Sequence, residues 1–233
     1  MTQKQFVDAT LALYDQLEEI RVTAGLQDAA PVAHGWYTAV RRWARAALVL
    51  EDAGFGHEAA PLRRSMIEHA LAIHWLVAAP VDALTALARS SQLIAQKMQA
   101  AMDDQWTVPA EVFDAIRSVE FAPSAEDRNL HFTSLAKRFS QDNLYVAWLH
   151  ESQYCHPSLV SAQAYLSIAK TGETQLLLHP EEADGFLPQT IVSLLIASEG
   201  FNQVLDGAPW TEQLTDLVQR FVSAHRASSA PKQ

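Results

Sequence analysis

The sequence contains little cysteine and little glycine. Cys155 is its single cysteine, and only 8 of the 233 residues are glycine. One cysteine cannot form an internal disulfide, so a disulfide-stabilised extracellular scaffold is excluded. Few glycines, together with abundant alanine, leucine, glutamine and glutamate, favour helices over a strand-rich fold.

Long apolar runs are also missing. The longest, from Ala70 to Val81, is interrupted by His74 and Pro80 and is too short to span a bilayer. No apolar signal core follows Met1. We therefore expect a cytoplasmic protein without a membrane segment.

Positive charge is scarce, with 17 basic residues against 27 acidic residues and a formal net charge of −10. This balance argues against broad, non-specific binding to nucleic acid, which relies on a basic surface. Two consecutive predicted helices nevertheless carry five of the basic residues, and we interpret these mainly as ordinary surface charge: Arg41, Arg42, Arg45, Arg63 and Arg64.

The segment from Ala60 to Ala79 is predicted to be the central helix of the fold. It is apolar on most sides, which is typical of a helix surrounded by other helices. Arg64 and Glu68 lie four residues apart and therefore share a face. Buried charge is costly unless it is paired, so this ion pair either fixes helix packing or prepares Arg64 to bind an anion.

The rest of the chain predicts an all-α fold of about eight helices packed around this helix, in one domain over residues 1–227, with a disordered tail at 228–233. Residues 120–129 are expected to form a loop, and Thr174–His179 a short extended piece. Hydrophobic periodicity places the other helices at Thr2–Ala24, Ala30–Ala53, Val81–Asp104, Pro109–Val119, Phe132–Phe139, Leu144–His156, Ser158–Ala169, Pro188–Leu205 and Pro209–Ala227.

The helix Leu144–His156 carries a second group of polar side chains. Tyr145, Ser152 and His156 fall on one helical face, together with Leu149, and Pro157 forces a boundary next to His156. A histidine at such a position either hydrogen-bonds a freed carbonyl or acts as a general acid and base. If the two helices meet, Ser152 and His156 join Arg64 and Glu68 in one internal polar cluster.

Both motifs resemble segments of a bacterial family of unknown function, domain of unknown function 5677. The helix Leu62-Arg63-Arg64-Ser65, followed by Glu68, resembles the Arg-Ser…Glu helix of that family. Its Ser-x-x-x-His-Pro-Ser segment matches the later motif, with an aromatic residue before it: Tyr145, Ser152, His156, Pro157 and Ser158. The resemblance extends from the second helix to Leu205 and implies no established activity.

A second resemblance is to the HEPN helical superfamily, whose ribonuclease members carry an arginine, four to six residues and then a histidine. Arg64 and His69 have four residues between them and satisfy this pattern. Five residues rotate a helix by about 140°, so these two side chains share a face only if the helix bends.

Three functions remain open at this stage. The first is metal-independent cleavage of RNA, in which Arg64 holds the phosphate, Glu68 orients it and His156 or His69 moves the proton, with Ser152, Tyr145 and Trp75 contacting the ligand. The second is a non-enzymatic interaction protein in which the cluster is structural. The third is a small-molecule binder whose pocket is walled by tryptophans: Trp43, Trp75 and Trp148.

Neither a cofactor nor a metal is expected. The sequence has no Glu-x-x-His pair of the di-iron type and no phosphate-binding glycine loop. The expected partners are RNA or a small anionic ligand, with a homodimer as an open alternative.

Overall fold

The computed structural model describes residues 1–101, 121–170, 172–180 and 186–229. The fold is all-α, as predicted, with helix α3 (Ala60–Ala78) at its centre. Ala60–Ala79 was the predicted range. The side chains of Met66, Ile67 and Ile73 are inaccessible to solvent, which is why this helix could be apolar on most of its sides.

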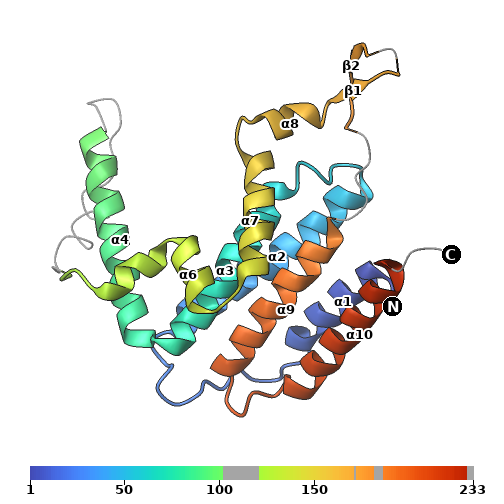
Figure 1. Cartoon of the computed structure of the whole chain (residues 1–233). Coiled ribbons are helices and arrows are strands. Elements are labelled where there is room, and N and C mark those ends of the chain that lie inside the picture. The colour runs from blue at the N-terminus through green and yellow to red at the C-terminus, as the bar shows by residue number, and fades with distance from the viewer. Residues whose placement is uncertain (102–120, 171, 181–185, 230–233) are drawn as a thin grey trace.

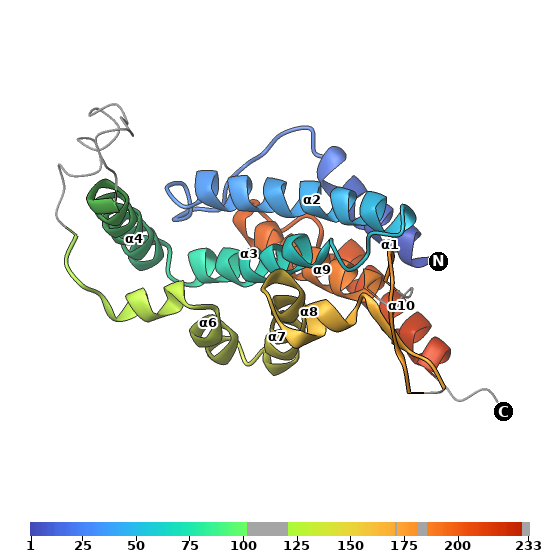
Figure 2. The same cartoon turned by 90° about the horizontal axis from the view of Figure 1, so that it is seen from above.

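Helices cover α3 on several sides. Helix α2 (Ala30–Asp52) lies on one side and α7 (Asp142–Cys155) on the other, while α9 (Leu187–Val204) packs along α3 (Figures 1 and 2). Helices α1 (Gln3–Asp15) and α10 (Thr211–Ser229) pack against the outer side of α9 and against each other (Figure 1). None of the helices in these described ranges is long and apolar enough to cross a membrane.

A second group of elements leaves the far end of α3. Helix α4 (Pro80–Ala101) begins directly after α3 and projects from the bundle (Figure 1). The 3-10 helix η1 (Ala125–Leu130) and helix α6 (Phe132–Arg138) then lead back to α7, and they contact α4 and α3, respectively. Residues 120–129 were expected to be a loop, so η1 corrects that prediction.

The predicted first helix, Thr2–Ala24, is too long. Helix α1 ends at Asp15, because the following segment hydrogen-bonds to the end of α9 and to the residues after it instead of continuing the helix. The Thr23 N–H donates to the carbonyl of Val204, and the Asp206 N–H donates to the carbonyl of Arg21. Long-range pairing therefore replaced the local helical bonds.

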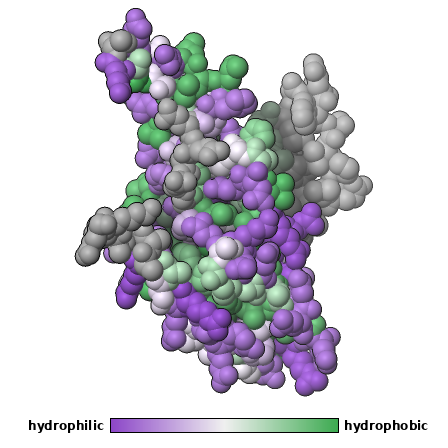
Figure 3. Space-filling model, turned by 90° about the vertical axis from the view of Figure 1, so that its right-hand side faces the viewer, coloured by the Kyte–Doolittle hydropathy of each residue, from purple (hydrophilic) through white to green (hydrophobic). Residues whose placement is uncertain are grey.

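The predicted helix Ser158–Ala169 is also wrong in its second half. Helix α8 (Leu159–Gln163) is followed by strand β1 (Leu166–Ile168), which pairs antiparallel with β2 (Thr174–Leu176). The extended piece predicted at Thr174–His179 is confirmed for β2. This hairpin projects from the bundle and carries exposed apolar side chains among hydrophilic ones at the top of Figure 3, where Ile168 is 76% and Leu176 85% exposed.

The remaining predicted elements agree with the structure to within a few residues. The part of the chain that the structure describes contains ten helices when η1 is counted, against the expected number of about eight. The predicted helix Pro109–Val119 lies outside the described residues, and so do residues 230–233 of the predicted tail. Helix α10 continues to Ser229. A single domain over 1–227 stays a prediction.

Candidate functional site

Two consecutive arginines of α3 connect it to α7 in different ways. The Arg63 Nη2 lies 2.9 Å from the Glu151 Oε2, and the two side chains are 1% and 0% exposed. The Arg63 Nη1 also donates to the carbonyl of Gly56 at 2.8 Å. The buried ion pair of α3 is therefore Arg63–Glu151, and the expectation that Arg64–Glu68 is buried was wrong. Consecutive residues point about 100° apart on a helix, so only one arginine can face the core.

Arg64 reaches the surface between α3 and α7. Its Nε lies 3.3 Å from the Glu68 Oε1, with the two side chains 25% and 36% exposed. Its Nη1 lies 2.9 Å from the Nε2 of His156, 92 residues further along the chain. A guanidinium only donates hydrogen bonds, so the Nε2 of His156 is the acceptor. The structure thus brings together Arg64, Glu68 and His156, in a cluster that is open to solvent.

His156 lies at the end of α7 with an extended backbone, φ −123° and ψ 155°. This conformation is the one that a following proline favours. The imidazole is therefore held beside Arg64 by the helix boundary that Pro157 imposes.

Trp148 of α7 completes the contact with Glu68. Its indole N–H donates to the Glu68 Oε1 at 2.7 Å, and the Arg64 guanidinium lies 5.0 Å from its ring centroid. The ring stacks on Phe132 at 5.2 Å and on Tyr145 at 6.1 Å. The Glu68 Oε1 thus forms an ion pair with Arg64 of α3 and accepts a hydrogen bond from Trp148 of α7.

Ser152 and Tyr145 have other roles in the structure. The Ser152 Oγ–H donates to the carbonyl of Trp148 at 2.6 Å, within α7 itself. Tyr145 contributes a stacking partner for Trp148. Ser152, Tyr145 and His156 are not among the described residues that line the pocket next to the cluster.

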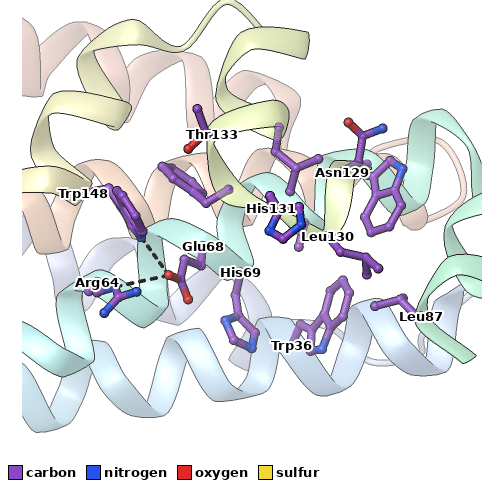
Figure 4. A pocket seen from close by; sticks show the side chains of 14 residues that line it. Trp36, Arg64, Glu68, His69, Leu87, Asn129, Leu130, His131, Thr133 and Trp148 are labelled. Carbon is purple, nitrogen blue, oxygen red and sulfur yellow. Dashed lines mark hydrogen bonds and ion pairs between the residues drawn. The ribbon is translucent and has the colours of Figure 1, made fainter. Parts of the chain in front are cut away.

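That pocket has a volume of about 380 Å³ and lies between α3 and the α4–η1–α6 group (Figure 4). Residues of six elements line it, most of them aromatic or apolar. They are Trp36, Arg64, Glu68, His69, Ala72, Trp75, Leu87, Asn129, Leu130, His131, Phe132, Thr133, Leu135 and Trp148.

His69 lines this pocket together with Arg64, although the five-residue spacing argued against a shared face. The pocket extends far enough around α3 to reach both side chains (Figure 4). The His69 Nδ1–H donates to the carbonyl of Ser65 at 2.8 Å, and the ring packs edge-on against Trp43 at 4.8 Å. Burial lowers the pKa of His69 and outweighs the opposing effects of the Ser65 carbonyl and of Glu68. His69 is therefore neutral near pH 7.

Trp75 is buried in the pocket wall, where its indole N–H donates to the Glu126 Oε2 at 2.8 Å. The same oxygen accepts from Asn129 at 2.6 Å and from Arg138 at 2.5 Å. Desolvation acts to raise the pKa of Glu126, but these hydrogen bonds together lower it. Glu126 of η1 thereby links Trp75 of α3 to Arg138 of α6. These hydrogen bonds fix the position of η1 and α6 beside the pocket.

Sequence reasoning missed several wall residues. Trp75 and Trp148 lie in the wall that was expected of a small-molecule binder, but Trp43 does not; Trp36 takes its place. Trp36 and Trp43 are seven residues apart on α2 and share a face, so the spacing could have indicated both. Asn129 and His131 had no such signal: Asn129 ends the segment that was interpreted as a loop, and His131 lies between that segment and the next predicted helix.

The described residues contain no group of three or more His, Cys, Asp or Glu side chains that could hold a metal ion. Cys155 lies beside the cluster, with its Sγ–H directed at the carbonyl of Glu151 at 3.2 Å. Burial raises the pKa of the Cys155 thiol, and the nearby Arg64 opposes this shift only in part. The thiol is therefore a poor nucleophile at neutral pH.

The model of DUF5677, a family of unknown function, matches residues 30–174. The chain therefore belongs to this family. The pocket and the Arg64–Glu68–His156 cluster lie entirely within the matched segment. No curated protein and no solved structure matches the chain.

Proposed function

We propose that this protein is a small-molecule-binding helical bundle, with the pocket beside α3 as its binding site. The observation that carries this proposal is a cavity of about 380 Å³ with tryptophan walls and a few polar groups. Ligand sites have this character: they are concave, mainly apolar and aromatic, and about 300–1,000 Å³ in volume.

The wall is also fixed in place, which supports the proposal. Glu126 joins η1 to Trp75, and Glu68 joins α3 to Trp148. Side chains held in this way lose little further entropy when a ligand binds, so less of the binding energy is spent on ordering them.

A substitution that fills the pocket tests the proposal. Ala72 lines the cavity on α3, so Ala72→Leu should reduce its volume while keeping a residue with a good helix propensity. The matched control is Ala78→Leu, at an exposed position of the same helix. We expect a fragment screen followed by tryptophan fluorescence to give ligands that bind wild type and Ala78→Leu equally and bind Ala72→Leu at least about tenfold more weakly. A screen with no ligand sensitive to Ala72→Leu would reject the proposal.

Metal-independent cleavage of RNA is the second candidate, and it is favoured by the contact of Arg64 with His156 at an open surface. The same contact limits it, because the Nε2 lone pair that would take a proton is already accepting from Arg64. On this hypothesis the wild type cleaves single-stranded RNA in the presence of EDTA, and Arg64→Ala and His156→Gln each abolish the cleavage. No cleavage by the wild type, or cleavage that survives in both variants, rules this function out.

A bacterial cytoplasm remains our proposal for the setting of this protein. It is supported by a chain whose single cysteine requires no oxidising compartment. Fractionation of a tagged native strain tests this, and recovery in a secreted fraction would contradict it.

A further inference from the structure

Two charged side chains of opposite sign, Arg64 and Glu68, line the pocket. They differ in the contacts that each already makes within the protein. Arg64 forms an ion pair with Glu68 and donates a hydrogen bond to His156, and its guanidinium lies over Trp148. These contacts place its positive charge against a carboxylate of its own helix and an imidazole and indole ring at the α7 side. An anionic ligand would have to compete with them.

Only one of the two carboxylate oxygens of Glu68 contacts the described residues through a hydrogen bond or an ion pair. Its Oε1 accepts from Trp148 and pairs with Arg64. Among the described residues none donates to its Oε2, and the side chain is 36% exposed at the pocket wall. Figure 4 shows Glu68 projecting from α3 between Arg64 and His69. A carboxylate oxygen is therefore left for a ligand that donates hydrogen bonds.

The other charged groups around the pocket do not favour an anion. His69 is neutral because of its burial. Arg138 is paired with Glu126, and Arg89 is paired with Asp127. The chain as a whole carries a formal net charge of −10, and this field attracts cations to the molecule.

The aromatic rings of the pocket wall also favour a positively charged ligand. Trp36, Phe132 and Trp148 contribute indole and phenyl rings to the pocket. The faces of such rings carry partial negative charge and attract ammonium groups within about 6 Å. Arg64 already makes such a contact with Trp148, at 5.0 Å.

We infer that the ligand of this pocket is a small organic cation, a protonated amine with an apolar or aromatic part. The ammonium group donates to the Glu68 Oε2, and the apolar part lies among Trp36, Phe132 and Leu87. This inference rests on the proposed binding function and specifies the chemical class that the pocket selects.

Four probes of similar size and different charge test the inference: phenethylamine, phenethyl alcohol, phenylacetate and phenylalanine. Binding is measured by tryptophan fluorescence and calorimetry at pH 7 and one fixed salt concentration. We expect phenethylamine to bind about tenfold more tightly than phenethyl alcohol, and phenylacetate to bind most weakly. Equal or tighter binding of the alcohol, of phenylacetate or of the zwitterionic phenylalanine overturns the inference.

Glu68→Gln removes the charge and keeps an oxygen that can accept from Trp148. We expect it to weaken phenethylamine binding by about tenfold and to leave phenethyl alcohol binding unchanged. The thermal unfolding midpoint of the variant reports whether it is folded. Thr133→Lys, on the α6 side of the pocket, is the second variant: it introduces a competing cation and should weaken the amine while strengthening phenylacetate. Unchanged amine affinity in either folded variant contradicts the inference.

Failure of this inference differs from failure of the proposed function. If all four probes fail to bind the wild type, the amine inference is overturned. The proposed function fails only if the broader fragment screen gives no ligand that Ala72→Leu weakens relative to Ala78→Leu.

Discussion

Arg63 and Glu151 form an ion pair of 2.9 Å that is sealed from solvent between α3 and α7. The guanidinium also lies 4.2 Å from the ring centroid of Phe186, so it is enclosed on a further side. Breaking such a pair leaves one buried charge without a partner, which is costlier than never having had the pair. Arg63–Glu151 therefore fixes where α7, and with it Trp148 and His156, sits against α3.

Glu151→Gln keeps the size of the side chain and removes its charge. We expect it to lower the free energy of unfolding by about 3–5 kcal/mol, measured by urea denaturation, because Arg63 stays buried and charged. Asp52→Asn is the control: it breaks the exposed Lys4–Asp52 pair and should cost far less, because solvent screens both charges. Replacing both partners, as Arg63→Met with Glu151→Leu, should restore most of the lost stability. A loss in Glu151→Gln no larger than that in the control would contradict this role.

Gly200 allows α9 to approach α3 closely. A Cβ at this position would lie 3.0 Å from the His74 Cδ2 and 3.0 Å from the Ile73 Cγ2. His74 has little freedom to move, because its Nε2 lies 3.0 Å from the carbonyl of Ile196. Gly200→Ala should therefore destabilise the protein by about 1–3 kcal/mol through overpacking.

Gly35, within α2, provides the matched control, since a Cβ built there would meet no atom within 4 Å apart from its chain neighbours and the backbone of its own helix. Gly35→Ala should stabilise the protein by about 0.5–1 kcal/mol, because alanine is the better helix former. Thermal and urea unfolding of the two variants measure the difference. The same sign of effect at both positions would show that close packing at Gly200 is not important.

His69 makes stability depend on pH in a defined direction. Burial lowers its pKa in the folded state, so between that value and the unfolded value of 6.5 the unfolded chain binds more protons. Its stabilising contribution is complete above pH 6.5 and is lost as the pH falls through the folded-state pKa. His69→Gln should accordingly reduce the loss of stability between pH 7.5 and pH 5.

The measurement is urea denaturation of wild type and His69→Gln at both pH values, with His150→Gln as the control at an exposed histidine. Other titrating groups contribute equally to all three proteins, so the comparison isolates His69. A His69→Gln protein that loses as much stability on acidification as the wild type would refute the assignment.

The hydrogen bond from Trp75 to Glu126 should be measurable as a coupling energy. Trp75→Phe removes the indole N–H, and Glu126→Ala removes the acceptor. A double-mutant cycle on the free energy of unfolding should give about 1–3 kcal/mol, as expected of a partly buried hydrogen bond to a charged group. Coupling near zero would mean that Glu126 holds η1 through Asn129 and Arg138 alone.

The central helix could be predicted from the sequence because local patterning and tertiary environment agree there. Residues 60–79 are apolar on nearly every side, and only a helix enclosed by others accommodates that pattern. The end of the first helix could not be predicted, because it depends on the pairing of Val22 with Leu205, which is far away in the sequence.

The site was only partly predictable for the same reason. The spacing of Arg64 and Glu68 identified their contact, and the His156-Pro157 boundary identified a second group nearby. Which arginine is buried depends on the rotation of α3 relative to α7, and no pattern in one helix determines that angle. The wall from Asn129 to Thr133 depends on how η1 folds back onto α3, which the hydrogen bonds of Glu126 specify.

Helix α9 lies beyond residue 174, the last residue of the family match, yet it packs along α3 more extensively than any helix that the structure describes inside that segment. Without α9, the buried side chain of Ile73, which lies against Gly200, would face water. The stretch recognisable as DUF5677 is thus shorter than the set of helices that packs around α3. An excised fragment of residues 30–174 should be insoluble or unstructured, so domain dissection of this family needs to keep the C-terminal helices.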